Sequence, residues 1–195
     1  RAGSEPESIM ALTPSNMLPL GTRAPQFSLP DTVSGQTLSL QAQRGVRGTL
    51  VMFICNHCPY VKAIADKIAR DTAELAAFGV TSIAIMSNDT EAYPADSFDN
   101  MIRFAATHNF NFPYLIDETQ QVARTYDAVC TPDFFGFDSD LGLQYRGRLD
   151  ESRASPVERA RRDLFEAMKQ VAETGDGPRE QIASMGCSIK WKTGV

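Results

Sequence analysis

An unbroken apolar run that ends in a pair of cysteines constrains this chain more than any other stretch. Residues 50–55 are all apolar, which suits a strand buried on both faces and is too short to cross a membrane. Cys58 follows Cys55 with two residues between them, and Pro59 comes next. Because proline lacks an N–H and has a preset φ, it favours the first turn of a helix. The stretch therefore predicts a buried strand, a Cys-x-x-Cys turn and a helix in succession.

The placement of this pair favours redox chemistry. At a helix N-terminus, unpaired N–H groups and the helix dipole stabilise a thiolate. His57 lies between the two cysteines and adds positive charge when it is protonated. Two thiols in this setting are suited to reversible oxidation to a disulfide, and we interpret the rest of the chain as the fold that positions them.

Two other uses of the cysteines stay open. A Cys-x-x-Cys is also half of a zinc site, although Cys130 and Cys187 are single and no second Cys-x-x-Cys or His-x-x-x-His is present. A module that holds zinc or copper(I) with Cys55, Cys58 and Cys130 is the alternative from another functional class. Inert burial is the second alternative. A haem attachment site would need histidine where Pro59 stands, which argues against haem. Under the redox interpretation we expect no resident metal.

Composition narrows the choice of partners. The net charge of −5 over 195 residues argues against nucleic acid or an anionic membrane as the main partner. No stretch reaches about 18 consecutive apolar residues, and no apolar segment typical of a signal peptide is visible. Four cysteines are few for a secreted disulfide scaffold, so we expect a cytoplasmic setting. No dinucleotide fingerprint is present, so we expect no cofactor, with electrons supplied by another thiol protein or a small thiol.

The pattern of apolar residues predicts a mixed α/β fold. We expect a central sheet with helices on both faces and the dithiol at the carboxyl end of a central strand. Residues 1–20 are expected to form an arm, 21–176 one domain, and 177–195 a tail packed on or near that domain. Expected strands cover 36–40, 49–54, 80–86 and part of 109–117, with a hairpin of 133–137 and 144–149 after a change of direction at 129–132. Expected helices cover 59–78, 98–107, 119–126 and 155–174, the last beginning at a Ser-x-x-Glu capping box, and 41–48 reads as a loop.

Several landmarks in order resemble one known family. The chain is similar to the thioredoxin-fold redoxins, in their peroxiredoxin-like (AhpC/TSA-related) branch, over about residues 20–192. The matching segments are 21–30, 53–59, 112–117, 130–135 and 186–192. The resemblance implies a thioredoxin-like fold and a cis peptide bond between Thr131 and Pro132 that faces the dithiol. Cys130 would then lie one residue from the site.

The resemblance implies two different chemistries. Thioredoxin-type enzymes attack disulfides with the first cysteine, here Cys55, and resolve the mixed disulfide with the second, here Cys58. Typical peroxiredoxins carry Pro-x-x-x-Thr-x-x-Cys, and their peroxidatic cysteine aligns with Cys58. In this chain Val51 replaces the proline and Cys55 the threonine. That departure favours dithiol–disulfide exchange, with peroxide reduction at Cys58 as the alternative.

The expected mechanism places roles on the residues around the pair. We expect the helix N-terminus and His57 to lower the pKa of Cys55. Asn56, Cys130, Thr131 and Pro132 are expected to line the site or to tune it. A docked tail would bring Cys187 to the dithiol as an extra redox thiol, and inert packing is the other reading. The expected partners are a disulfide-containing protein, or a small disulfide or peroxide, together with a thiol reductant. A homo-oligomer is compatible with the sequence.

Overall fold

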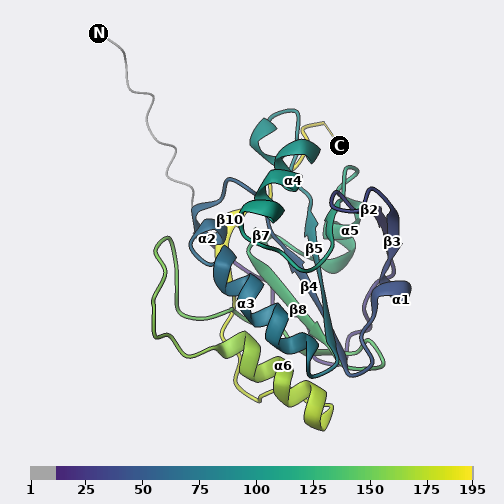
Figure 1. Cartoon of the computed structure of the whole chain (residues 1–195), viewed down its shortest axis with the longest axis vertical. Coiled ribbons are helices and arrows are strands. Elements are labelled where there is room, and N and C mark those ends of the chain that lie inside the picture. Colours follow the sequence, from purple (N-terminus) through teal and green to yellow (C-terminus); the bar gives the residue numbers. More distant parts are fainter. Residues whose placement is uncertain (1–11, 195) are drawn as a thin grey trace.

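A five-stranded mixed sheet forms the centre of the molecule (Figure 1). The computed structural model describes residues 12–194. The strands lie in the order β6, β5, β4, β8, β9; their bounds are Tyr114–Ile116, Val80–Met86, Gly48–Phe53, Asp133–Phe137 and Leu143–Tyr145. Strands β4, β5 and β6 run parallel, whereas β8 is antiparallel to β4 and to β9. Because a helix joins the predicted strands 49–54 and 80–86, the sequence predicts that these two strands run parallel, and the pairing of β4 with β5 confirms it.

The central strand β4 contributes to a core on each side of the sheet. Successive side chains of a strand point to opposite faces, so Leu50 and Met52 belong to one apolar cluster and Val51 and Phe53 to the other. The first cluster packs against α3 (Ala65–Ala76), α4 (Phe98–Thr107) and α6 (Asp163–Thr174). The second cluster packs against α1 (Leu40–Gln43), α5 (Gln121–Tyr126) and the hairpin formed by β2 (Ser28–Pro30) and β3 (Thr37–Ser39). The expected α/β fold with helices on both faces is confirmed.

A second, three-stranded sheet joins both ends of the chain to the middle of the sequence. Its order is β1 (Leu12–Pro14), β10 (Met185–Ser188) and β7 (Cys130–Thr131), all antiparallel. Strand β1 lies in the expected arm, whose residues 1–11 are outside the described part, and β10 lies in the expected tail. Strand β10 also contacts α2 (Pro59–Lys62). The C-terminal segment is therefore built into the fold beside the Cys-x-x-Cys turn.

Two predicted helices differ from the structure. The helix expected over 59–78 is two helices, α2 and α3, because Ile64 leaves the helical region with φ −117° and ψ 3°. The helix expected from Ser155 begins only at Asp163. Arg162 precedes that residue and bonds to Asp71 and Glu74 of α3, which fixes the start of α6. The capping box at Ser155 was therefore a wrong prediction, whereas the end of α6 at Gly175, with φ 84°, is as expected.

Smaller differences lie in the connections. The loop expected over 41–48 begins with the short helix α1, capped by the Ser39 side chain, which accepts from the Ala42 N–H. The second strand of the hairpin, β9, is shorter than the 144–149 that we expected. Strand β5 and helix α4 match their predicted bounds. Within residues 12–194 no helix is both long and apolar enough to span a bilayer.

Candidate active site

The two cysteines of the Cys-x-x-Cys turn lie where β4 passes into α2. Cys55 is two residues beyond the end of β4, and Cys58 is the N-cap residue of α2, with Pro59 at the first helical position. The N–H of Ile54 still bonds to the carbonyl of Ile85 on the neighbouring strand, so the turn is anchored to the sheet. Both cysteines are buried, with 1% of Cys55 and none of Cys58 exposed.

The second sheet covers this turn and supplies the atoms that contact the sulfurs. The Sγ of Cys187 on β10 lies 2.7 Å from the Sγ of Cys58. The carbonyl oxygen of Thr131 on β7 is 3.4 Å from the Cys58 sulfur, and its Oγ1 is 3.6 Å from the Cys55 sulfur. The peptide bond between Thr131 and Pro132 is cis, as the resemblance implies. Three cysteines and Thr131 thus form one buried cluster.

The charges of the two thiols differ from what we expected. Hydrogen bonding with Cys187, and then with Cys55, holds the pKa of Cys58 far below its usual range despite burial. The pKa of Cys55 is raised, first by its hydrogen bond with Cys58, then by burial and by the carboxylate of Asp96. The expectation of a lowered Cys55 pKa is therefore wrong. Two bonded thiols do not both ionise easily, and the one with more donors around it takes the charge.

The other two cysteines occupy different surroundings. The thiol of Cys187 has a raised pKa, chiefly through its hydrogen bond with Cys58 and through burial. Burial also raises the pKa of Cys130, and the carboxylate of Asp133 adds to the effect. The Cys130 sulfur contacts the carbonyl oxygen of Pro132 at 3.7 Å. Cys187 thus contacts the dithiol directly, whereas Cys130 reaches the site through the backbone of Pro132.

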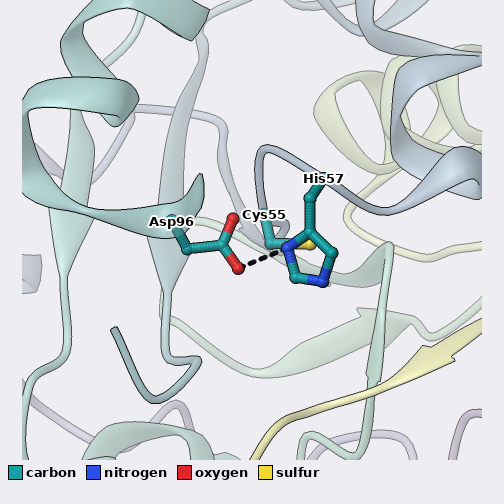
Figure 2. A group of neighbouring side chains, drawn as sticks. All are labelled: Cys55, His57 and Asp96. Atoms are coloured by element: carbon teal, nitrogen blue, oxygen red, sulfur yellow. Dashed lines mark ion pairs between the residues drawn. The ribbon is translucent and has the colours of Figure 1, made fainter. Parts of the chain in front are cut away.

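A carboxylate that we did not single out in the sequence lies beside Cys55 and His57 (Figure 2). Asp96 ends the 3₁₀ helix η1 (Pro94–Asp96) in the loop that follows β5, and it is fully buried. Its Oδ2 lies 2.6 Å from Nδ1 of His57. The His57 ring stacks on Tyr93, with the ring centroids 5.5 Å apart and the planes 9° from parallel. The only signal in the sequence is that this loop follows the strand next to β4, so both turns meet at one edge of the sheet.

Backbone and amide donors hold Asp96 in place. The N–H of Asn56 donates to Oδ1 at 2.7 Å, and Nδ2 of Asn88 donates to Oδ2 at 2.9 Å. The side chain of Asn56 in turn accepts from the hydroxyl of Tyr114 at 2.8 Å and donates to the carbonyl of Ala95 at 3.1 Å. Asn56 therefore ties the Cys-x-x-Cys turn to η1 and to β6.

The described residues contain one group with the donor atoms of a metal site, and it differs from the thiolate set considered above. Cys55, His57 and Asp96 bring their ligand-type atoms within 4.8 Å of one another. Two ligands of one tetrahedral ion, each bound at about 2.0 Å, would stand about 3.3 Å apart. The atoms of His57 and Asp96 lie closer than that. In this arrangement they pair with each other rather than share an ion.

A surface pocket adjoins the cis proline on the outer side of the cluster. Its wall includes Tyr60 of α2, Pro132, Phe134 and the segment of Ser184 and Met185 that leads into β10. No cysteine lines this pocket. The carbonyl of Thr131, the residue before Pro132, contacts the Cys58 sulfur, so the pocket and the cluster share this segment of backbone.

Comparison with known proteins agrees with this fold. Residues 20–146 match the model of the AhpC/TSA family. Among solved structures, an uncharacterized conserved protein from Geobacillus kaustophilus is 44% identical with a TM-score of 0.90, covering 95% of this chain and 99% of that one. A hypothetical protein from Sinorhizobium meliloti is 37% identical with a TM-score of 0.88, covering 93% and 100%.

More distant structures share the fold alone. A secreted disulfide oxidoreductase from Mycobacterium tuberculosis is 18% identical with a TM-score of 0.56, covering 75% of this chain and 95% of that one. No curated protein matches the chain.

Proposed function

Because this chain belongs to the AhpC/TSA family, we propose that it is a thiol–disulfide oxidoreductase that works through Cys58 and Cys55. One observation carries the proposal: both thiols of the Cys-x-x-Cys turn are buried where β4 passes into α2, with Cys58 at the N-cap and its sulfur 2.7 Å from that of Cys187. In this setting their pKa values shift in opposite directions, down for Cys58 and up for Cys55. A thiolate is the attacking species in disulfide exchange, and the second thiol must stay protonated until its turn. Opposite shifts within one dithiol suit this division of labour.

The roles of the two cysteines follow from these shifts, and they reverse the assignment that we expected from the sequence. The Cys58 thiolate attacks one sulfur of a substrate disulfide, a new bond forms to Cys58, and the other substrate sulfur leaves as a thiolate that takes up a proton. Cys55 then loses its proton and attacks the Cys58 sulfur. The second substrate thiol leaves, and the Cys55–Cys58 disulfide remains. The substrate is reduced by two electrons, and an external thiol reductant restores the dithiol.

Access to Cys58 requires the second sheet to move. Cys58 has no exposed surface, and its sulfur is covered by Cys187 of β10 and by Thr131 of β7. Strand β10 is four residues long and is paired on both sides. Displacing it would open the cluster toward the pocket beside Pro132. We therefore place the substrate there. We assign to Cys187 the role of an extra thiol that attacks the Cys58 sulfur when β10 returns, so that a Cys58–Cys187 bond forms, the Cys55–Cys58 bond breaks and Cys55 leaves as a thiol.

Peroxide reduction is the second candidate, and the position of the thiolate favours it. Cys58 occupies the place of the peroxidatic cysteine in the family resemblance, and its pKa is the lowered one. Its thiolate would attack one peroxide oxygen and break the O–O bond. Cys58 becomes a sulfenic acid, and the other oxygen takes up a proton and leaves as an alcohol, or as water when the substrate is hydrogen peroxide. Condensation with the thiol of Cys55 or Cys187 would release water and leave a disulfide.

A serine series separates these functions. We expect Cys58→Ser to abolish reduction of a protein disulfide such as that of insulin, because no attacking thiolate remains. We expect Cys55→Ser to form a stable mixed disulfide at Cys58 but not to turn over. Peroxide consumption that needs Cys58 but not Cys55 would favour the second candidate. Cys130→Ser is the matched control, because the Cys130 sulfur contacts the carbonyl of Pro132 and the carboxylate of Asp133. Full activity of Cys58→Ser in both assays would refute both functions.

A further inference from the structure

The proposed resolving step contains a problem of proton transfer. Cys55 must become a thiolate before it attacks, yet its pKa is raised and only 1% of the residue is exposed. Hydroxide from bulk solvent therefore reaches this thiol poorly. A buried thiol with a raised pKa needs a proton acceptor next to it in order to react near neutral pH.

The pair of His57 and Asp96 is placed where such an acceptor is needed (Figure 2). The Cys55 sulfur lies within 4.8 Å of both a ring nitrogen of His57 and a carboxylate oxygen of Asp96. Nε2 of His57 is buried and has no hydrogen-bond partner among the described residues. Asp96 has no exposed surface, and Asn56 and Asn88 fix its orientation. This ring can take up a proton, with a negative charge beside it to stabilise the product.

We propose that His57, positioned by Asp96, accepts the proton of Cys55 in the resolving step and returns it to the departing thiolate. This inference rests on the proposed function. A separation of up to 4.8 Å allows transfer through one water molecule, or directly after a small approach of the groups. The Cys55 S–H bond breaks and an N–H bond forms on His57. The Cys55 thiolate then forms the bond to Cys58, the bond from Cys58 to the substrate breaks, and the leaving sulfur takes the proton from His57.

The surrounding groups explain why a relay is used rather than a permanently charged Cys55. The titratable groups beside the pair are Cys55 on the same turn, Tyr93 before η1, whose ring stacks on His57, and Tyr114 on β6, which interacts with Asp96. Cys58 acts on the pair through its hydrogen bond with Cys55. Burial and the nearby charges raise the pKa of Tyr114, so it stays neutral. The hydrogen bond with Cys58, burial and the Asp96 carboxylate together keep the proton on Cys55 while Cys58 is a thiolate. Once Cys58 is joined to substrate its charge is gone, and loss of the Cys55 proton becomes easier.

The test follows a single turnover of the reduced protein with oxidised glutathione. Acid quenching and mass spectrometry measure formation and decay of the mixed disulfide at Cys58. In His57→Gln we expect normal formation but a decay about a hundredfold slower at neutral pH, which is the range of general-base effects. The decay should then rise with hydroxide concentration, whereas the wild type should reach a plateau. Added imidazole should restore the decay in His57→Gly.

The positioning role of Asp96 is tested in the same way. Asp96→Asn should change the pH profile of the decay, and Asp96→Glu should recover part of the wild-type profile. His108→Gln is the matched control, because His108 also pairs with an aspartate, Asp66, at 2.8 Å but has no cysteine in that pair. Its decay and pH profile should equal those of the wild type.

Four outcomes would overturn the inference. A His57→Gln protein with wild-type decay and pH profile would refute the relay while leaving the proposed function intact. Failure of imidazole to rescue His57→Gly would assign a merely structural role to the ring. A decay that slows when a chelator is added would mean that the cluster holds a metal ion instead. No mixed disulfide at Cys58, even in Cys55→Ser, would refute the proposed function itself.

Discussion

The sulfur of Cys187 lies 2.7 Å from the sulfur of Cys58, although 129 positions separate the two residues in the sequence. This contact makes the C-terminal segment part of the candidate site. It also gives the Cys58 sulfur two thiol neighbours, since Cys55 is hydrogen-bonded to it as well. A disulfide needs the two sulfurs at about 2.05 Å, so the Cys187 sulfur has only a short way to move when an oxidant takes two electrons from this pair.

The first prediction concerns the charge of Cys58. Replacing Cys187 by alanine removes the contact that contributes most to the lowered pKa. Since a hydrogen bond to a charged group contributes about 1.5–3 kcal/mol, we expect the pKa of Cys58 to rise by about one to two. Titration of the thiolate absorbance in the ultraviolet measures it. Cys130→Ala should leave the titration unchanged, and an unaltered pKa in Cys187→Ala would contradict the role of this contact.

The second prediction tests whether β10 closes the site. A Cβ atom added at Gly186 would overlap the carbonyl oxygen of Thr131 on the paired strand. Overpacking of this kind costs about 1–3 kcal/mol, which the chain can relieve by moving β10 away from β7. We therefore expect Gly186→Ala to speed alkylation of Cys58 by a bulky maleimide about tenfold. Ser188→Ala changes an exposed side chain of the same strand and should react like the wild type.

The third prediction concerns the start of α6. Asp71 of α3 is fully buried, and the side chain of Arg162 donates to its Oδ1 at 2.6 Å. Removing this donor leaves the carboxylate with Arg70 as its remaining ion-pair partner. We expect Arg162→Ala to lower the free energy of unfolding by about 1–3 kcal/mol, measured by urea denaturation. Arg159→Ala, at an exposed position, should change it little, and equal losses in both variants would contradict the assignment.

Patterns within single elements were sufficient to predict most of the fold. The unbroken apolar run predicted β4, and apolar residues at helical spacing predicted the bounds of α4. The start of α6 could not be predicted, because Arg162 is fixed by side chains of α3 rather than by its neighbours in the sequence. The break at Ile64 was also hidden, since one helix and two consecutive helices have the same apolar period.

The candidate site was predicted only as far as the Cys-x-x-Cys turn. The charges of its thiols depend on groups far away in the sequence, namely the thiol of Cys187 and the carboxylate of Asp96. The segment containing Cys187 gave a weak hint, because the tail resembled the family. Asp96 gave none beyond its place in a polar loop after β5. The pairing of β4 with β5 could be predicted, but which side chains of the two following loops meet depends on loop conformations that the apolar pattern does not specify.

The last prediction concerns a buried ion pair between the first residue of β8 and the residue that follows β9. Arg146 and Asp133 have no exposed surface, and the guanidinium of Arg146 pairs with the carboxylate and lies over the ring of Phe135 at 3.7 Å. Burial raises the pKa of Asp133 to about 6 even though Arg146 opposes this shift. Arg146→Met leaves a buried carboxylate without its partner, so we expect a loss of about 3–5 kcal/mol in the free energy of unfolding at neutral pH.

The loss in the free energy of unfolding of Arg146→Met should grow as pH rises. Without Arg146 the pKa of Asp133 in the folded state rises further, so the folded variant needs this carboxyl protonated. The contribution of the protonated carboxyl to the free energy of unfolding is fully present below the pKa of an unfolded aspartate, about 3.9. It is lost as pH rises through the pKa of Asp133 in the folded state. The free energy of unfolding of the variant, measured by urea denaturation at a series of pH values, should therefore be closest to that of the wild type at acidic pH and furthest from it above neutral pH.

The double variant Asp133→Asn/Arg146→Met should lose this dependence on pH, because no ionisable group remains at the site. A deficit in Arg146→Met that is constant across the series would mean that lost packing on Phe135, rather than the stranded charge, accounts for the effect.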